Sequence, residues 1–237
     1  MAEAERVVLV TGPTGNSGPA VVRALAADGV LLGLVGRDEG RLEAVARETG
    51  LVEARWLAVA ADVRRPEEAR RAVAEVSDRF GRLDAVVHLV GGYTGGTPVA
   101  ELDHDELRAM LEQHLWTTLH VVQAALPGML ERGWGRIVAV SSPMALEPGR
   151  KSAAYAVGKA AEETLLRTLA REVAGTGVTA NILVVRAVDV AHDRETEASA
   201  RNAGWTTPEE LAAAVRFLCS DAAAAINGAR LPLDGRA

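Results

Sequence analysis

Tyr155, Lys159 and Ser142 are the residues whose types and spacing could support acid–base chemistry. Tyr155 and Lys159 stand four positions apart, so on a helix they share one face and an ammonium can lie near a phenol. A phenol ordinarily has a pKa of about 10, and a nearby cation favours its ionised form. Ser142 stands thirteen positions before Tyr155 and can hydrogen-bond a substrate oxygen. The three residues predict a proton transfer to or from an oxygen atom.

A glycine-rich segment predicts a site for a dinucleotide. It follows the β-branched run 6–11, which is typical of a buried strand, and it precedes a helical periodicity over 20–27. Glycines at a spacing of three allow a tight turn and a close approach to a pyrophosphate, which the N-terminus of the next helix attracts. The expected cofactor-binding residues of this loop are Gly12, Thr14, Gly15, Asn16, Ser17 and Gly18.

Arg37 follows the predicted second strand, at the place where a carboxylate would bind the ribose hydroxyls of NAD. A guanidinium there favours the 2′-phosphate of NADP through charge-assisted hydrogen bonds. We therefore expect NADP(H) to be favoured over NAD(H), with Thr14 as a second ligand of the phosphate. The alternative interpretation is that Arg37 is a solvated surface residue and that Asp38 turns inward to the ribose.

The order of the predicted elements places these residues in an α/β fold. Strands and helices alternate, and crossovers of this length imply parallel strands. We expect a single-domain, Rossmann-type doubly wound sheet of about seven strands. Residues 186–206 lack clear periodicity and are expected to form a substrate lid. The predicted strands are 6–11, 30–35, 55–59, 84–90, 136–140, 178–185 and 230–233, and the predicted helices are 20–27, 39–48, 66–80, 103–131, 153–174 and one that starts at 207.

Composition indicates one globular domain over residues 1–237. The chain is 49% hydrophobic and has a net charge of −6 without a basic cluster, which predicts no nucleic-acid partner and no membrane-surface partner. No apolar run approaches the about 20 residues of a membrane span, and residues 1–6 lack the basic start of a signal peptide. Cys219 is the single cysteine, so we expect a reducing, cytoplasmic location. The five histidines show no ligand spacing, and we expect no metal site.

With these residues in place, the chain resembles the short-chain dehydrogenase/reductase family nearly from end to end. The resemblance implies that Tyr155 is the acid or base, that Lys159 also holds the nicotinamide ribose, and that the cofactor moves the hydride. It adds Asp62, Val63 and Gly91 to the expected cofactor-binding residues, together with Tyr155 and Lys159. The motifs that carry the resemblance are the glycine loop, Ala61-Asp62-Val63, Ser141-Ser142, Tyr155-Ala156-Val157-Gly158-Lys159 and the tail from TTPEELAAAVRFLCSD to LDG.

Some positions depart from the family pattern. The sequence His88-Leu89-Val90-Gly91 replaces Asn-Asn-Ala-Gly, and the middle glycine of the loop is Gly15, as in the nucleotide-sugar branch of the family. Val185-Arg186 replaces a Pro-Gly turn. Arg186 could therefore reach the nicotinamide pocket, where it would meet an anionic substrate or occupy space that a cofactor needs.

His114 stands where the family has a catalytic asparagine in its long fifth helix. One interpretation is that His114 holds a water behind Lys159 and relays a proton, with an ionisation visible in turnover between about pH 5 and 8. The other is that His114 is a packed helical residue. The sequence leaves both open.

The favoured function is an NADP(H)-dependent oxidoreductase that interconverts a carbonyl and an alcohol on a small to medium-sized, fairly apolar substrate. The alternatives are a catalytically weakened member with a binding or regulatory role, and nucleotide-sugar epimerisation or dehydration. Tyr93, Met144, Trp205 and Arg186 are candidate substrate contacts, although each could equally be loop packing. Helices 114–131 and 153–174 are apolar over more than one face, so we expect a homodimer or homotetramer.

Overall fold

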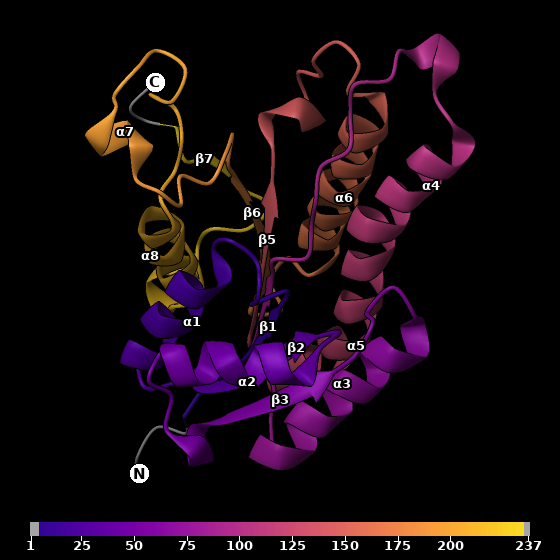
Figure 1. The fold of residues 1–237 in the computed structure, drawn as a ribbon. Helices are drawn as coiled ribbons and strands as arrows, with labels where there is room; N and C mark the ends of the chain where they lie inside the picture. The colour runs from indigo at the N-terminus through magenta and orange to yellow at the C-terminus, as the bar shows by residue number, and fades with distance from the viewer. Residues whose placement is uncertain (1–4, 235–237) are drawn as a thin grey trace.

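The computed structural model describes residues 5–234, and a parallel sheet of seven strands forms its centre (Figure 1). The strand order is β3-β2-β1-β4-β5-β6-β7. Residues 1–4, part of the predicted N-terminal segment, and residues 235–237, which include the glycine of the LDG motif, lie outside the described residues. The strands are β1 (Val7–Thr11), β2 (Leu31–Gly36), β3 (Trp56–Ala60), β4 (Ala85–His88), β5 (Gly135–Ser141), β6 (Val178–Val184) and β7 (Arg230–Pro232).

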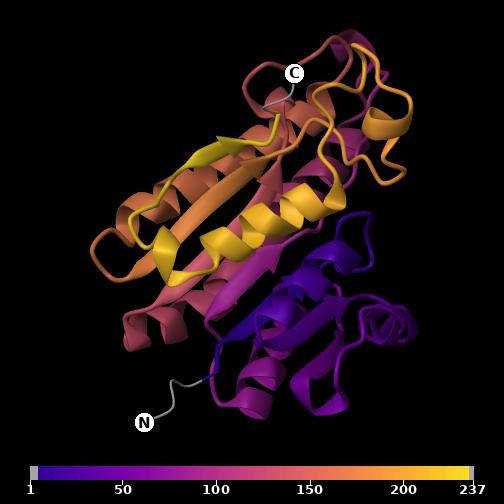
Figure 2. The ribbon, with the colours of Figure 1, turned by 90° about the vertical axis from the view of Figure 1, so that its left-hand side faces the viewer.

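Helices cover both faces of the sheet (Figures 1 and 2). Helices α1, α2 and α8 pack on one face, and α3, α5 and α6 pack on the other. The α-helices are α1 (Gly18–Ala27), α2 (Glu39–Glu48), α3 (Pro66–Phe80), α4 (His104–Leu111), α5 (Thr117–Arg132), α6 (Ala153–Glu172), α7 (Asp193–Thr196) and α8 (Pro208–Leu218). Shorter helical turns are η1 (Glu53–Arg55), η2 (Val99–Glu101), η3 (Glu112–Trp116), η4 (Pro143–Ala145) and η5 (Asp221–Ala223).

The β-branched run of β1 illustrates why the core has two halves. Val7 and Leu9 pack with α3, α5 and α6, whereas Val8 and Val10 pack with α1, α2 and α8, because successive side chains of a strand point to opposite faces. All four are buried, as parallel strands covered on both faces require. Each such side chain contributes about 1.5–3 kcal/mol by leaving water.

The strand order reverses between β1 and β4, and this reversal positions the site. The chain builds β1, β2 and β3 in one direction and then crosses to β4 on the other side of β1. Loops after neighbouring strands therefore diverge at the carboxyl ends of β1 and β4. Such a crevice is where open α/β sheets bind ligands.

The fold class expected from the sequence is confirmed. Helices α2 and α3 have the predicted bounds, and Thr207 and Glu210 form a capping box at the start of α8, where a helix was predicted to begin. Strand β4 ends at His88, two residues before the predicted end. The apolar pattern continues beyond it, but Leu89 and Val90 turn into the loop and form part of a cleft instead of a ladder.

The predicted long helix over 103–131 contains a wider turn. Between α4 and α5, the segment η3 is a π-helix, in which the Thr117 N–H donates to the Glu112 carbonyl five residues earlier. The hydroxyls of Thr117 and Thr118 donate to the carbonyls of Gln113 and His114, both at 2.7 Å. Single π-helical turns inside α-helices occur often at functional sites.

Residues 186–206, the predicted lid, are held against α8. The buried Asp189 carboxylate accepts hydrogen bonds from the N–H groups of Asp193 and Arg194, both at 2.9 Å, at the start of α7. Arg194 then forms an ion pair with Glu210 of α8 at 2.8 Å. The segment therefore contains one short helix, α7. Apolar periodicity could not indicate this helix, because polar contacts and not an apolar stripe hold it in place.

Candidate active site

Two glycines of the loop after β1 are required by its geometry. Gly12 has a φ of +72°, and a β-carbon there would lie 3.0 Å from the Val90 nitrogen. At Gly18 a β-carbon would lie 1.8 Å from the Pro13 carbonyl oxygen. The backbone can turn this tightly and enter α1 only without side chains at these positions. The loop leaves a surface on which a pyrophosphate can approach the backbone and the helix N-terminus.

A cleft of 520 Å³ lies beside this loop at the carboxyl ends of β1, β2 and β4. It contains most of the predicted cofactor residues, whereas Asn16, Ser17 and Gly18 lie in the turn that enters α1. Predicted residues that line the cleft are Gly12, Thr14, Gly15, Arg37, Asp62, Val63 and Gly91. This volume fits a dinucleotide. The glycines of the loop fit it too, because they carry no side chain and the ligand can approach their backbone.

Cations border the end of the cleft near β2. Arg37 is exposed there, and Arg41 and Arg64 also line the cleft. Arg41 donates to the Thr14 carbonyl at 3.4 Å. Sequence reasoning missed Arg41, which lies in the first turn of α2, a short distance along the chain from Arg37.

The two carboxylates near these cations already have partners. Asp38 accepts a hydrogen bond from the Arg41 N–H at 3.1 Å and caps α2, which disfavours the interpretation that it turns to the ribose. Asp62 accepts from Arg64 Nε at 2.9 Å, and this contact lowers the pKa of Asp62. The Asp62 carboxylate is therefore ionised and oriented at the rim of the cleft.

Tyr155 lies half-buried in the first turns of α6, between two other rings. Its ring meets those of Tyr93 and His114 edge-on, with centroids 5.1 Å and 5.5 Å away. Ser142 is buried directly after β5, where its hydroxyl accepts from the Met144 N–H at 3.3 Å and caps η4. Because η4 packs against α6, the predicted serine and tyrosine belong to neighbouring elements.

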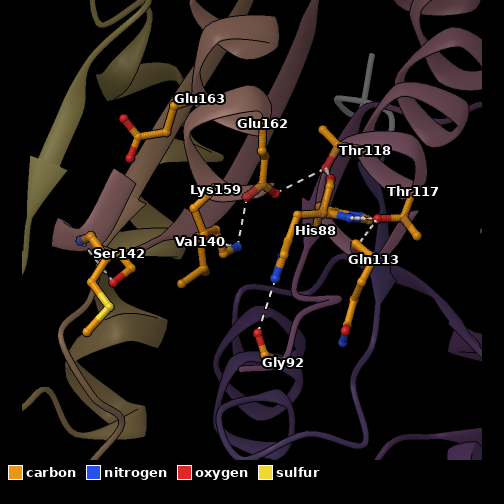
Figure 3. Close-up of polar contacts among 12 residues, drawn as sticks. His88, Gly92, Gln113, Thr117, Thr118, Val140, Ser142, Lys159, Glu162 and Glu163 are labelled. Atoms are coloured by element: carbon orange, nitrogen blue, oxygen red, sulfur yellow. Dashed lines mark hydrogen bonds and ion pairs between the residues drawn. The ribbon is translucent and has the colours of Figure 1, made fainter. Parts of the chain in front are cut away.

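Lys159 has two fixed partners that the sequence did not predict. Its Nζ donates to the Val140 carbonyl and to Glu162 Oε2, both at 2.7 Å, and its side chain is 5% exposed (Figure 3). An ammonium has three N–H donors, so one remains for a further partner. Lys159 also lies next to the cleft, since a β-carbon on Gly91 would be 4.0 Å from its Nζ.

His114 reaches the same place from the π-helical segment. Its Nε2 lies 3.1 Å from the Gly92 carbonyl and donates to it, and its Nδ1 is buried without a partner among the described residues. A β-carbon on Gly91 would be 3.6 Å from His114 Cε1, so His114 and Lys159 flank the same glycine. A buried acceptor without a partner can accept a hydrogen bond, and a water molecule is one possible donor.

The expected ionisation of His114 between pH 5 and 8 is wrong. Burial and the nearby Lys159 ammonium lower the pKa of His114 to about 3. The imidazole is therefore neutral throughout that range, because a second cation beside Lys159 would be buried and repelled. Whether neutral His114 holds a water behind Lys159 stays a prediction.

The departure at His88 has a structural explanation. His88 ends β4, and its two ring nitrogens lie 2.7 Å from the hydroxyl of Thr11 and 3.1 Å from that of Thr117. It therefore connects β1, β4 and α5 beneath the glycine loop. Burial lowers the pKa of His88 to about 3, so it too is neutral.

These two histidines predict how stability depends on pH. Their folded pKa values lie below the ordinary 6.5, so the unfolded chain binds protons that the folded chain excludes. The free energy of unfolding should fall as the pH falls from about 6.5 to 3, by about 1.4 kcal/mol per pH unit for each histidine. Urea unfolding between pH 6 and pH 4 measures this slope. His114→Asn should make the slope shallower by one histidine's share, and an unchanged slope would contradict the assignment.

The predicted substrate contacts do not converge on one place. Tyr93 is 61% exposed and packs on the Tyr155 ring, and Met144 belongs to η4 beside Ser142. Trp205 lines a separate cleft of 370 Å³ with Arg194 and other residues of the lid and the C-terminal strand. Arg186 is exposed directly after β6.

Among residues 5–234, no group of three His, Cys, Asp or Glu side chains could hold a metal ion. None of the helices described there has the length and apolar character needed to cross a bilayer.

Comparisons with known proteins agree with this fold. The model of the short chain dehydrogenase family matches residues 6–201, so the chain belongs to that family. Family members bind nicotinamide dinucleotides and act as oxidoreductases.

The chain is 34% identical to a (2S)-[(R)-hydroxy(phenyl)methyl]succinyl-CoA dehydrogenase subunit of Thauera aromatica, over 95% of this chain and 92% of that protein. It is 29% identical to the acetoacetyl-CoA reductase of Allochromatium vinosum, over 97% of both. The solved 3-ketoacyl-(acyl-carrier-protein) reductase of Brucella melitensis in complex with NADH superposes with a TM-score of 0.87, at 25% identity and 98% coverage of both chains.

Proposed function

We propose that the protein interconverts a carbonyl and an alcohol on a small to medium-sized substrate by hydride transfer with NADP(H). The observation that carries the proposal is the position of Lys159 beside Gly91, which lines the dinucleotide cleft, on the helix that also holds Tyr155. This position supports an arrangement in which the nicotinamide binds beside the acid–base residues, as hydride transfer to a carbonyl carbon requires.

Each residue has one role in this proposal. Ser142 donates a hydrogen bond to the substrate oxygen, and Tyr155 gives that oxygen its proton or removes it. Lys159 favours the ionised phenol and holds the nicotinamide ribose with its remaining N–H donor. A bound nicotinamide supplies or accepts the hydride.

Substrate selection is assigned to the loops at the carboxyl ends of the strands. Tyr93, Met144, Arg186 and Trp205 are proposed contacts, and residues 186–206 are the proposed lid.

Two named relatives act on CoA thioesters, so a test panel should contain 3-ketoacyl-CoA compounds beside ketones, aldehydes and quinones. NADPH and NADH consumption with this panel, beside a titration of cofactor binding, tests the function. Tight binding with no consumption on any compound would overturn it. A weakened, non-catalytic member is not favoured, because the named relatives are dehydrogenases and reductases.

The preference for NADP(H) is supported by the cations at the end of β2. Arg37 and Arg41 line the cleft, and Asp38, the nearest carboxylate, is engaged as a helix cap. Arg37→Ala should weaken NADPH binding about tenfold or more and NADH binding much less, because the lost partner is the 2′-phosphate. Fluorescence titration with both cofactors measures the ratio. An equal loss for both would contradict the phosphate assignment.

We also propose a homodimer or homotetramer in the cytoplasm. Trp116 is 45% exposed and Val157 is 45% exposed, on the two helical elements that were predicted to be apolar over more than one face. The buried side chains of these helices, such as Val122 and Leu166, already pack on the sheet, so the exposed apolar groups lie outside that contact. Pairing across a twofold axis would cover them.

A further inference from the structure

Glu162 places a buried negative charge against Lys159. The two side chains stand three positions apart on α6, with Nζ 2.7 Å from Oε2, and they are 5% and 1% exposed. The other carboxylate oxygen, Oε1, lies 3.1 Å from the Thr118 hydroxyl, whose one proton is shared between this oxygen and the His114 carbonyl at 2.7 Å. Figure 3 shows Glu162 between these two partners, so both of its oxygens are engaged.

The adjacent Glu163 provides an internal comparison. It is equally buried, at 1% exposed, but Figure 3 shows it turned away from Lys159. Glu163 pairs instead with Arg230 of β7 at 3.0 Å. Arg230 also donates to the Ser142 carbonyl at 3.3 Å. The same helix therefore carries two buried carboxylates, of which one connects to β7 and the other to the lysine expected to act on Tyr155.

Stability alone does not account for the Lys159–Glu162 pair. Removing two charges from water costs several kcal/mol per ion, and buried pairs replaced by apolar residues often leave a protein equally stable or more stable. Burial raises the pKa of Glu162, while Lys159 and Thr118 act in the opposite direction. The 2.7 Å contact with the Lys159 ammonium favours the ionised carboxylate, whose charge opposes that of Lys159.

Few other charges surround Tyr155. His88 and His114 are neutral above pH 5, since burial lowers the pKa of each to about 3. Tyr93 lies edge-on to the Tyr155 ring, and Glu163 is neutralised by Arg230. Among these neighbouring groups, the Lys159 ammonium and the carboxylate that offsets it are the ones that carry charge toward the phenol.

We propose that Glu162 is a positioning residue that holds the Lys159 ammonium against Val140 and offsets its charge, so that it sets the pH at which Tyr155 exchanges its proton. The chemical effect of this carboxylate is to keep the phenol protonated to a higher pH than the lysine alone would allow. This inference deepens the proposed function, on which its catalytic meaning rests.

A titration of the phenol tests the proposal without substrate or cofactor. The chain has two tyrosines, so in a Tyr93→Phe background the ultraviolet absorbance of tyrosinate reports Tyr155 alone. Glu162→Gln keeps the side-chain size and removes the charge. The midpoint of the titration should move to lower pH by about one pH unit, because the Lys159 charge is no longer offset. Glu163→Gln removes an equally buried charge that does not touch Lys159 and should move the midpoint by a few tenths of a unit at most.

The outcomes separate the two proposals. An unchanged midpoint in a folded Glu162→Gln protein, with or without a loss of activity, would overturn the role of Glu162. A shifted midpoint in a protein that turns over no carbonyl compound would support that role while the proposed function fails. If Glu162→Gln does not fold, Thr118→Val removes one hydrogen bond to the carboxylate and should move the midpoint in the same direction by less. The absence of that movement would also overturn the proposal.

Discussion

Tyr155→Phe is expected to lower turnover by about 10²- to 10⁴-fold, because it removes the group that exchanges a proton with the substrate oxygen. The ring stays, so the edge-on contacts with Tyr93 and His114 and the packing of α6 should be retained. Cofactor affinity should change little. Steady-state kinetics on any substrate found in the panel, together with a cofactor titration, measure both quantities.

A matched variant makes this result specific. Tyr93→Phe removes a hydroxyl from the neighbouring ring, which is exposed and does not lie on α6. It should cost far less turnover than Tyr155→Phe. Comparable losses in the two variants would indicate that the ring contact and not the proton matters, and near-native turnover of Tyr155→Phe would refute the assigned acid.

Gly18→Ala is expected to have the largest effect on the glycine loop. A β-carbon at Gly18 would lie 1.8 Å from a backbone oxygen, so the turn itself must move. We expect a loss of about 1–3 kcal/mol or more in the free energy of unfolding and a large loss of cofactor affinity, because loop and helix N-terminus shift together. Urea unfolding and a cofactor titration measure these changes.

Gly40→Ala is the control for that variant. Gly40 lies in α2, and its added carbon would meet the Asp38 carboxylate at an ordinary 3.5 Å. Alanine favours a helix over glycine by about 1 kcal/mol, so this variant should be as stable as the parent or more stable. If Gly18→Ala behaved like Gly40→Ala, the close approach at Gly18 would not be a constraint.

The sequence was sufficient for the fold because its signals are local. The continuous β-branched run of β1, the capping box and the first proline of α8, and strand–helix alternation each depend on near neighbours in the chain. The π-helical turn in the predicted long helix could not be seen in the sequence. An inserted residue shifts the apolar positions around the helix, and an α-helix with a slightly different buried face gives the same pattern. Glycine spacing likewise predicted the loop but not which glycines are sterically obligatory.

The sequence predicted the residue types of the candidate site, but it predicted fewer of the hydrogen bonds and ion pairs between them. Tyr155 and Lys159 come from one helix, and their relation follows from spacing. Glu162 lies three positions after Lys159 and could have been noticed as an acid on a face that also carries Leu166 and Leu169. The Val140 carbonyl, the Thr118 hydroxyl and the neutral state of His114 depend on packing between distant segments, which no local pattern reports.

The π-helical segment η3 also sets how far α5 is rotated about the helix axis relative to α4, so that the three elements form one long rod with two halves. One residue corresponds to about 100° of rotation in an α-helix, so the extra residue per turn lets His114 face Lys159 while Val121 and Val122 still face the sheet. A one-residue deletion in this segment would restore an ordinary helix and rotate one half away from its partners. The segment therefore acts as a spacer that keeps each half of the rod aligned with its own partners, the sheet for one half and the Lys159 region for the other.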